Sequence, residues 1–424
     1  MKEMPEIMAF LNFKTKDKMR IKTTIYLILS LFALWLMSCN SSVSSEKIDK
    51  RTEKEKKIDS AKVADIKDKT EKVDKFLKFF FKETELNGVA LVSYQGEIIS
   101  QKVQGYANKK ANEMLKLTTR FQLASVSKPF TATAIMILYQ DSLLKLDDEV
   151  SKYLTGFPYK GITIRMLLTH RSGLANYMYF SEKLTNRKNV IYNQDVVNMM
   201  VKSKPAPYLA FNTKHDYCNT NYALLASIIE KISGITYKEF MQKRIFDVAG
   251  MKNSFFYEEG KVNPTENVAL GYHYRWEVAL HTYQEGVLGD KGLYATVEDL
   301  FNFDRALYEE KILKKETLAL MHENGNPELE KSNYGFGWRI PQTDPFKGVV
   351  YHGGWYRGFN TIFVRDLKTQ STVVMFSNVR TRILGEAFHE IIRILRNEER
   401  NEVTLSALSD TLAAKLKRDS LEAN

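Results

Sequence analysis

The sequence predicts an α/β domain in which helices flank one antiparallel sheet that is built from N- and C-terminal segments. Residues 89–94 are rich in β-forming residues, Gln95-Gly96 makes a turn and residues 98–103 return, which is the pattern of a hairpin. Residues 360–365 and 372–377, which flank a polar turn, form a second such pattern near the other end of the chain. Between them lies a long, mainly helical stretch at roughly 121–335. Strands at both ends of a domain that enclose such an insertion indicate one sheet with helices packed around it.

Composition sets the broad class. The chain has 424 residues, of which 44% are hydrophobic and 27% are charged. This excludes collagen-like, wholly disordered and multi-pass membrane proteins. The length allows a sizeable core, either in two or three domains or in one large unit with an insertion. Two cysteines are too few for a disulfide scaffold.

The first residues have the pattern of an export signal. An apolar run at 25–36 follows the basic residues Arg20 and Lys22. It is too short to span a hydrocarbon core of about 30 Å comfortably. A basic segment followed by a short apolar run is typical of a secretory signal. The alternative is a plain membrane-anchor helix, and both place the rest of the chain outside the cytoplasm, at a membrane.

The end of this run refines the prediction. Residues 36–39 read Leu-Met-Ser-Cys, which is similar to a bacterial lipobox, a signal in which the cysteine is acylated and becomes the mature N-terminus. We therefore expect residues 1–39 to be a lipoprotein signal peptide, with Cys39 as the lipidation site and membrane anchor. Met19 is an alternative start to Met1. The predicted location is the cell envelope, facing the periplasm or the exterior.

The boundaries of the folded domain follow from polarity. Residues 40–72 hold ten basic and eight acidic residues without glycine or proline, which predicts a charged tether that is helical in part. From Val73 to Phe81 apolar residues recur at helical spacing. We expect the domain to cover 73–396, ending in a helix near 384–395. A polar tail follows at 397–424.

The net charge of +11 raises the question of nucleic-acid binding. Part of the excess lies in the first 22 residues and in the tether. The remainder is spread over the domain without a basic run or interleaved aromatic residues, which favours an ordinary solvated surface. We expect no nucleic-acid partner. No histidine or cysteine spacing is typical of a metal site, and no cofactor is predicted.

The first candidate for chemistry is Ser125-Val-Ser-Lys128, followed by a proline and a long apolar stretch. Because proline suits the first turn of a helix, Ser125 is expected at a helix N-terminus, with Lys128 one turn further on the same face. The helix dipole favours an oxyanion there, and the lysine amine can accept the serine proton. Alone the pattern is weak, since it recurs at 44–47 and 142–145.

The second candidate is Tyr217-Cys218-Asn219, ahead of a helical segment. A tyrosine hydroxyl near a lysine can relay a proton to a leaving group. Asn219 can orient the lysine and a substrate carbonyl. The alternative interpretation is a helix-capping asparagine beside a packed tyrosine, and the same spacing recurs at 106–108.

The third candidate is His352-Gly353-Gly354, before a strand. Glycines there allow another backbone to approach closely. The next peptide N–H, that of Trp355, can complete an oxyanion hole with the N–H of Ser125. The alternative is a tight turn with a surface histidine.

Together and in this order, the three patterns resemble the motifs of the serine β-lactamase and penicillin-binding-protein superfamily, most closely class C β-lactamases and their esterase and peptidase relatives. Segments at 119–130, 162–174, 292–300 and 334–338 also resemble that family, and the similarity extends over about 75–395. The resemblance implies a β-lactamase/transpeptidase-like fold and a serine hydrolase that forms an acyl-enzyme.

Two positions depart from the family pattern. His352 stands where most members have a lysine that helps to hold a substrate carboxylate, so esters or peptides gain weight over β-lactams. Cys218 replaces a serine, and we expect it to fill the serine's space without acting as a nucleophile. We expect His170 to order a loop through hydrogen bonds, and His215 to lie on the loop surface.

The resulting hypothesis is a serine hydrolase acting on small ester, peptide or D-amino-acid compounds. Ser125 is the nucleophile, Lys128 the base, Tyr217 the proton donor, Asn219 the orienting residue, and His352 lines the pocket edge. A D,D-carboxypeptidase or β-lactamase, acting on peptidoglycan peptides or β-lactams, is the enzymatic alternative. A non-catalytic binding module of the envelope on the same scaffold is the third hypothesis.

Overall fold

The structure is a computed structural model that describes residues 53–256, 267–329 and 331–398. The predicted signal peptide, the lipidation site at Cys39, the first part of the tether and the tail beyond residue 398 lie outside these ranges. In the ranges that are described, no helix is both long enough and apolar enough to cross a membrane.

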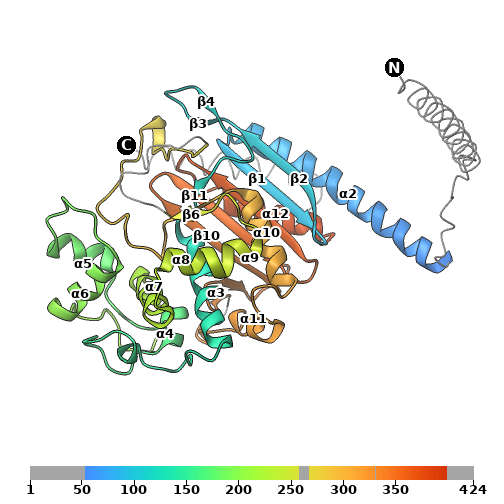
Figure 1. Ribbon diagram of the computed structural model, residues 1–424. Coiled ribbons are helices and arrows are strands. Elements are labelled where there is room, and N and C mark those ends of the chain that lie inside the picture. The colour runs from blue at the N-terminus through green and yellow to red at the C-terminus, as the bar shows by residue number, and fades with distance from the viewer. Residues whose placement is uncertain (1–52, 257–266, 330, 399–424) are drawn as a thin grey trace, which may run out of the picture. The chain divides into compact units, whose positions relative to one another are not determined.

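The centre of the fold is the antiparallel sheet that the sequence predicts. Among the described residues it has seven strands (Figure 1). In spatial order they are β2 (Glu97–Gln104), β1 (Gly88–Tyr94), β12 (Ser371–Ser377), β11 (Phe359–Asp366), β10 (Val349–Tyr356), β9 (Arg339–Pro341) and β8 (Ser332–Tyr334). Strand β1 pairs with β12, with Gly88 opposite Ser377. The two predicted hairpins and their union in one sheet are therefore confirmed.

The predicted insertion is also mainly helical. Its helices of five residues or more are α3 (Ser127–Gln140), α4 (Ile164–Leu168), α5 (Tyr177–Leu184), α6 (Asn193–Ser203), α7 (Asn219–Ser233), α8 (Tyr237–Met241), the π-helical η3 (Gln242–Phe246), α10 (Val297–Tyr308) and α11 (Lys315–Met321). Shorter ones are the turns η1 (Ala124–Val126), η2 (Val150–Lys152) and η4 (Tyr274–Trp276) and the three-residue α9 (Asp247–Ala249). Two small sheets accompany them: β3 (Tyr106–Asn108) pairs with β4 (Glu113–Met114), and β7 (Leu293–Ala295) lies between β5 (Phe121–Gln122) and β6 (Phe255–Phe256).

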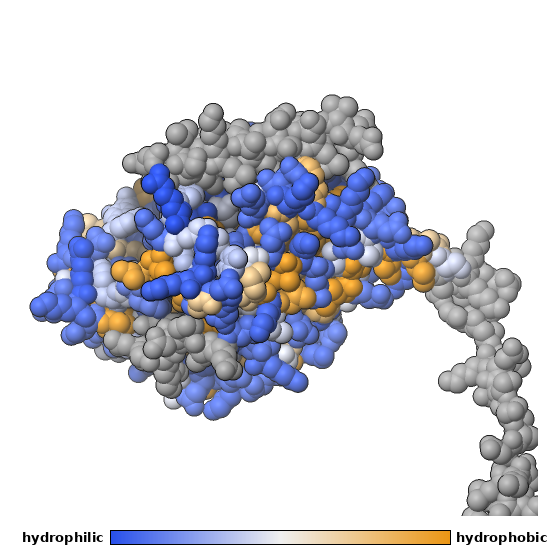
Figure 2. Space-filling model, turned by 90° about the horizontal axis from the view of Figure 1, so that it is seen from above, coloured by the Kyte–Doolittle hydropathy of each residue, from blue (hydrophilic) through white to orange (hydrophobic). Residues whose placement is uncertain are grey.

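The large sheet is buried on both faces. Because side chains alternate along a strand, Val89 and Leu91 of β1 join the core of the helical insertion. Their neighbours Ala90 and Val92 point the other way and join a second core, formed with residues 73–81 of α2 (Glu53–Glu83) and with α12 (Leu384–Leu395). On the face of the molecule shown in Figure 2, hydrophilic side chains predominate.

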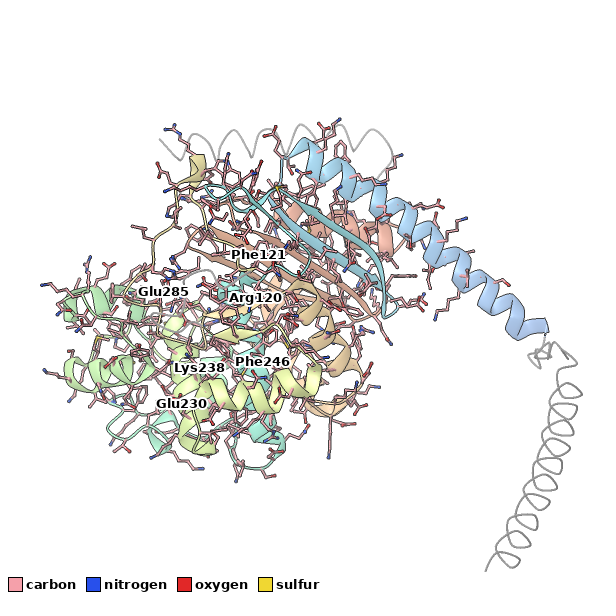
Figure 3. The ribbon with its side chains drawn as sticks, turned by 45° about the horizontal axis from the view of Figure 1, so that its top comes forward. Arg120, Phe121, Glu230, Lys238, Phe246 and Glu285 are labelled. Atoms are coloured by element: carbon pink, nitrogen blue, oxygen red, sulfur yellow. The ribbon has the colours of Figure 1, made fainter. Side chains whose placement is uncertain are left out.

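Phe121 of β5 connects the small sheet to the large one. Figure 3 labels Phe121. Its ring centroid lies 6.3 Å from that of Phe359 and 5.5 Å from that of Phe376. This contact matters for function because β5 leads directly into the segment that carries Ser125.

The start of the folded unit differs from the prediction. Helix α2 begins at Glu53, and the residues from Lys62 onward belong to the compact unit, eleven residues before the predicted boundary. Lys69 explains the difference, because its side chain is fully buried and Nζ donates to the carbonyl of Ile394 at 2.8 Å. A lysine that buries its alkyl stem and satisfies its ammonium in this way reads in the sequence as an ordinary solvated charge.

A buried ion pair joins α10 to the sheet. Asp304 and Arg365 are both fully buried, and Arg365 Nε lies 2.5 Å from Asp304 Oδ1. Asp304 also accepts hydrogen bonds from Arg305 and Thr372. Neither Nη1 nor Nη2 of Arg365 has a hydrogen-bond partner among the described residues, so its charge depends on Asp304.

We expect Asp304→Asn to lower the free energy of unfolding by about 3–5 kcal/mol, because it leaves the Arg365 charge buried without a counter-charge. Chemical denaturation followed by circular dichroism measures this change. Asp141→Asn is the matched control, since Asp141 and Arg244 pair at 2.7 Å on the surface and such pairs contribute at most about 1 kcal/mol. An equal decrease in the free energy of unfolding in the two variants would show that the buried ion pair stabilises the protein no more than the surface pair does.

Candidate active site

Ser125 lies in the turn η1, immediately before α3. The residue before it, Ala124, has a φ of 50°, in the left-handed region that a non-glycine residue rarely adopts. Such backbone strain gathers at functional sites. Ser125 is half-buried, whereas Lys128 in the first turn of α3 is completely buried. The predicted arrangement of serine and lysine on one helical face is thus present.

The amine of Lys128 is the centre of the site. Its Nζ lies 3.1 Å from Ser125 Oγ, 2.8 Å from Asn219 Oδ1 and 2.9 Å from the carbonyl oxygen of Asp290. The first contact lies within the first sequence pattern, and the second joins this pattern directly to the second one. The third comes from a loop ahead of β7 that the sequence analysis did not single out.

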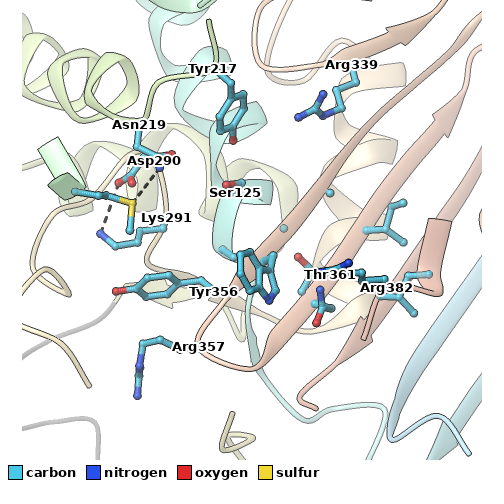
Figure 4. Close-up of a pocket in the computed structure, with 18 of the residues that line it drawn as sticks. Ser125, Tyr217, Asn219, Asp290, Lys291, Arg339, Tyr356, Arg357, Thr361 and Arg382 are labelled. Carbon is cyan, nitrogen blue, oxygen red and sulfur yellow. Dashed lines mark hydrogen bonds and ion pairs between the residues drawn. The ribbon is translucent and has the colours of Figure 1, made fainter. Parts of the chain in front are cut away.

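Tyr217 and Asn219 enter the site at the N-terminus of α7, whose first residue is Asn219. The ring centroid of Tyr217 lies 4.9 Å from Lys128 Nζ. In Figure 4 the hydroxyl of Tyr217 points toward Ser125. Both residues line the same pocket as Ser125, which has a volume of about 710 Å³.

Strand β10 forms the opposite wall of the pocket, through Gly353, Gly354 and Trp355. A Cβ atom on Gly354 would lie 2.2 Å from the carbonyl oxygen of Leu123 and 3.2 Å from Ala124 Cβ. Only glycine therefore allows β10 to pack against the backbone that leads into Ser125. The side chain of Trp355 is 60% exposed at the mouth of the pocket.

The side chain of His352 is placed differently from our expectation. It is 1% exposed and is not among the described residues that line the pocket. Nδ1 donates to the carbonyl of Gly353 at 2.8 Å, so Nε2 accepts from the hydroxyl of Tyr334 at 3.0 Å. Burial, helped by the charge of Arg339, holds the pKa of His352 well below its usual value. A neutral imidazole can be buried behind the pocket wall formed by β10. A charged lysine at this position would have to extend into the pocket, because burial disfavours its charge.

Arg339 is a functional candidate that sequence reasoning missed. It lies on β9 and lines the pocket, with its guanidinium carbon 5.5 Å from the ring centroid of Tyr217 (Figure 4). In the part of the chain that the structure describes, it forms no ion pair with a carboxylate. The sequence held a clue to Arg339, because the segment at 334–338 that resembles the family ends one residue before it.

A second group that the sequence analysis missed holds the loop behind Lys128. Lys291 is buried, and its Nζ donates to the hydroxyl of Tyr177 at 2.8 Å and to two loop carbonyls, those of Gln284 and Val287. The Tyr177 hydroxyl donates in turn to Asp290 Oδ2 at 2.9 Å. Burial lowers the pKa of Lys291. This network fixes the loop whose Asp290 carbonyl contacts Lys128.

Cys218 and the remaining histidines do not add a nucleophile or a metal site. Cys218 is 2% exposed, its thiol donates to the carbonyl of Leu174, and burial raises its pKa to about 11. A buried thiol of high pKa is inert, which agrees with the expectation. His215 is partly buried, and its Nδ1 lies 3.3 Å from the carbonyl of Thr169. Among the described residues, no cluster of three His, Cys, Asp or Glu side chains could hold a metal ion.

The fold and this site define a serine-based acyl-transfer enzyme of the β-lactamase type. The family model described as Beta-lactamase matches residues 64–394, and the chain belongs to this family. It is 35% identical to "Penicillin-binding protein 4*" of Bacillus subtilis (strain 168), over 69% of this chain and 68% of that protein.

Two further comparisons agree with this assignment. The chain is 25% identical to a "D-aminopeptidase" of Cereibacter sphaeroides, over 69% of this chain but only 56% of that protein. A penicillin-binding protein from Bacillus halodurans has a similar crystal structure, with a TM-score of 0.67 and 25% identity. That match covers 74% of this chain and 98% of the other.

We expect Gly354→Ala to destabilise the protein by about 1–3 kcal/mol, as overpacking does, and to slow the labelling of Ser125 by a fluorophosphonate probe. The added methyl group displaces the backbone just before the nucleophile. Gly353→Ala is the matched control, because its Cβ would meet no atom closer than 3.8 Å. If Gly354→Ala unfolds and labels like Gly353→Ala, the close packing does not position Ser125.

Proposed function

We propose that this protein is an envelope serine hydrolase that transfers the acyl group of an ester or amide to Ser125 and then to water. The observation that carries the proposal is the hydrogen-bonding position of Lys128. A lysine acts as a base only in its neutral form, whose amine has two N–H donors and one lone pair. In that form the carbonyl oxygens of Asn219 and Asp290, which can only accept hydrogen bonds, take both donors, and the lone pair faces Ser125 Oγ at 3.1 Å.

Each step of acylation then has a residue. Ser125 Oγ bonds to the acyl carbon while its proton passes to Lys128. The N–H groups of Ser125 and Trp355 stabilise the oxyanion, an effect worth about 3 kcal/mol per donor in other enzymes. Tyr217 protonates the leaving group as the bond to it breaks, and Lys128 passes the proton taken from Ser125 on to Tyr217. In deacylation the oxygen of a water molecule bonds to the acyl carbon, and one water proton passes through Tyr217 and Lys128 to Ser125 Oγ as the bond between Oγ and the acyl carbon breaks.

Esters and amides are the preferred substrates because of His352. Its side chain is neutral and buried, so the third sequence pattern offers no cation to a substrate carboxylate. A relative named for D-amino-acid substrates supports small amides as well as esters. The position of Lys128 also argues against a pure binding module, since binding alone does not need a base aimed at a serine.

Arg339 supports a second candidate, a D,D-carboxypeptidase or β-lactamase. It brings a guanidinium to the pocket from the strand next to β10, and arginine suits carboxylates because it binds them in a bidentate manner. Substrates of both activities carry a carboxylate, and a relative is named as a penicillin-binding protein.

The location and the domain organisation are part of the same proposal. We infer export by the signal at 1–39, lipidation at Cys39, a short tether and one hydrolase domain that ends near residue 396. An envelope location is supported by the relation to penicillin-binding proteins. Incorporation of a labelled fatty acid into the wild type, and its loss in Cys39→Ala, tests the anchor.

We expect Ser125→Ala to abolish both ester hydrolysis and fluorophosphonate labelling. Lys128→Met should slow hydrolysis by roughly 100- to 10,000-fold, because it removes the base. Labelling of the wild type with a fluorophosphonate and a fluorescent penicillin, side by side, separates the candidates. The first label alone indicates an esterase-like enzyme, both indicate a penicillin-recognising one, and neither indicates a binder. Full activity of Ser125→Ala would refute the scheme.

We expect Arg339→Gln to raise KM roughly 10- to 100-fold for substrates that carry a carboxylate, as the loss of a hydrogen bond to a charged group does. KM for an uncharged ester with the same acyl group should stay within about twofold, because no charge is left unpaired. Steady-state kinetics on the two substrates gives both values. Arg244→Gln, which removes an arginine paired on the surface, is the control. Equal changes for both substrates would exclude Arg339 as the carboxylate-binding residue.

A further inference from the structure

His170 lies directly behind Tyr217, in the turn after α4. Its side chain is fully buried, and its backbone has a φ of 58°, which a non-glycine residue rarely adopts. Its ring centroid is 4.3 Å from that of Tyr217, and the two rings are inclined by 39°. A buried histidine with this backbone conformation, in ring contact with a proposed catalytic side chain, suggests a functional role.

His170 forms hydrogen bonds with the residues on both sides of Tyr217 in the sequence. Its carbonyl accepts the N–H of Asp216 at 2.8 Å, and its Nδ1 accepts the N–H of Cys218 at 3.2 Å. Nδ1 also lies 3.1 Å from Nδ2 of Asn221. Asp216 and Cys218 are therefore both hydrogen-bonded to His170, and the ring of Tyr217 contacts the imidazole of His170.

These contacts determine the protonation of His170. A backbone N–H can only donate, so Nδ1 carries no proton and accepts. The amide of Asn221 fits the same assignment, because its Oδ1 accepts from Ser172 Oγ at 2.6 Å and leaves Nδ2 to donate. The remaining proton is on Nε2, which has no hydrogen-bond partner among the described residues. Burial and the charge of Lys128 hold the pKa of His170 well below its usual value.

His170 is thus unable to act as a base. Its lone pair at Nδ1 is occupied, and it is not among the described residues that line the pocket. It can fix the direction of the Tyr217 ring through the contact between the two rings and through its hydrogen bonds to Asp216 and Cys218. The hydroxyl of that ring points toward Ser125 (Figure 4).

We propose that His170 is a positioning residue that holds Tyr217 where its hydroxyl can protonate the leaving group. The inference rests on the role given above to Tyr217. A positioning role for His170 has a consequence that a purely stabilising role would not have. A nitrophenolate departs without a proton, whereas an alkoxide or an amine must be protonated. Loss of His170 should therefore affect poor leaving groups much more than good ones.

The test compares two substrates with the same acyl group, a 4-nitrophenyl ester and an ethyl ester, in the full chain. The measured quantity is the ratio of their kcat/KM values. Because unfolded protein contributes to neither rate, this ratio is independent of how much of a variant is folded. Tyr217→Phe provides the reference for complete loss of the proton donor.

His170→Phe keeps a ring but removes the acceptor. We expect it to reduce kcat/KM for the ethyl ester by roughly 100-fold, with a much smaller loss for the nitrophenyl ester. His170→Asn places an acceptor near the position of Nδ1 and should restore part of the difference. His170→Gln places it near Nε2 and should restore less. If His170→Phe does not fold, His170→Gln tests the same expectation.

The matched control is His215→Phe, which alters an imidazole of the same cluster, 5.9 Å from His170 between ring centroids, without touching Cys218 or Asn221. Its ratio should equal that of the wild type. The inference is overturned if the His170 variants lose equally on both esters, or if His215→Phe changes the ratio as much. Loss of activity in Ser125→Ala together with an unchanged ratio in His170→Phe would leave the proposed function intact and reject only the role of His170.

Discussion

The buried amine of Lys128 is the contact on which the other parts of the site depend. A lysine loses its hydration on burial and needs hydrogen-bond partners in return. Here they come from three distant places in the chain: the turn before α3, the start of α7 and the loop ahead of β7. Each partner is fixed by its own packing, so the direction of the amine follows from the fold. The position of the Lys128 amine next to Ser125 is in this sense a property of the whole domain.

The positively charged side chains at and next to the pocket are of two kinds. Lys128 and Lys291 are completely or almost completely buried and have all their hydrogen-bond partners within the protein, so they contribute to geometry more than to ligand attraction. Arg339 lies at the pocket surface without a carboxylate partner in the described part of the chain. The pocket, which Lys291 also lines, therefore combines an arginine that has no carboxylate partner among the described residues with a lysine whose hydrogen bonds are satisfied within the protein.

Much of this could be predicted from the sequence because the predicted strands are short runs of β-forming residues next to turn residues, and because the three patterns lie at helix starts and on a strand. The two hairpins, their union in one sheet and the helical insertion are local patterns, and local patterns survive folding. The misjudged features depend on distant contacts. Lys69 is buried only because α12 ends beside it, and His352 is hidden only because Tyr334 and Gly353 satisfy both of its nitrogens. Arg339 could not be found by spacing, since its place depends on how β9 pairs with β10.

The pairing of β1 with β12 has a consequence for biogenesis. Strand β1 can pair with β12 only after almost three hundred further residues have been synthesised. Strand β10, which forms one wall of the pocket, also lies near the C-terminal end of the domain. Pairings between such distant segments form slowly and only after the intervening chain is available. Ser125 of η1 and Lys128 of α3 are synthesised early, but the opposite wall of the pocket is absent until the C-terminal strands are synthesised. The candidate active site is therefore complete only after the sheet has closed.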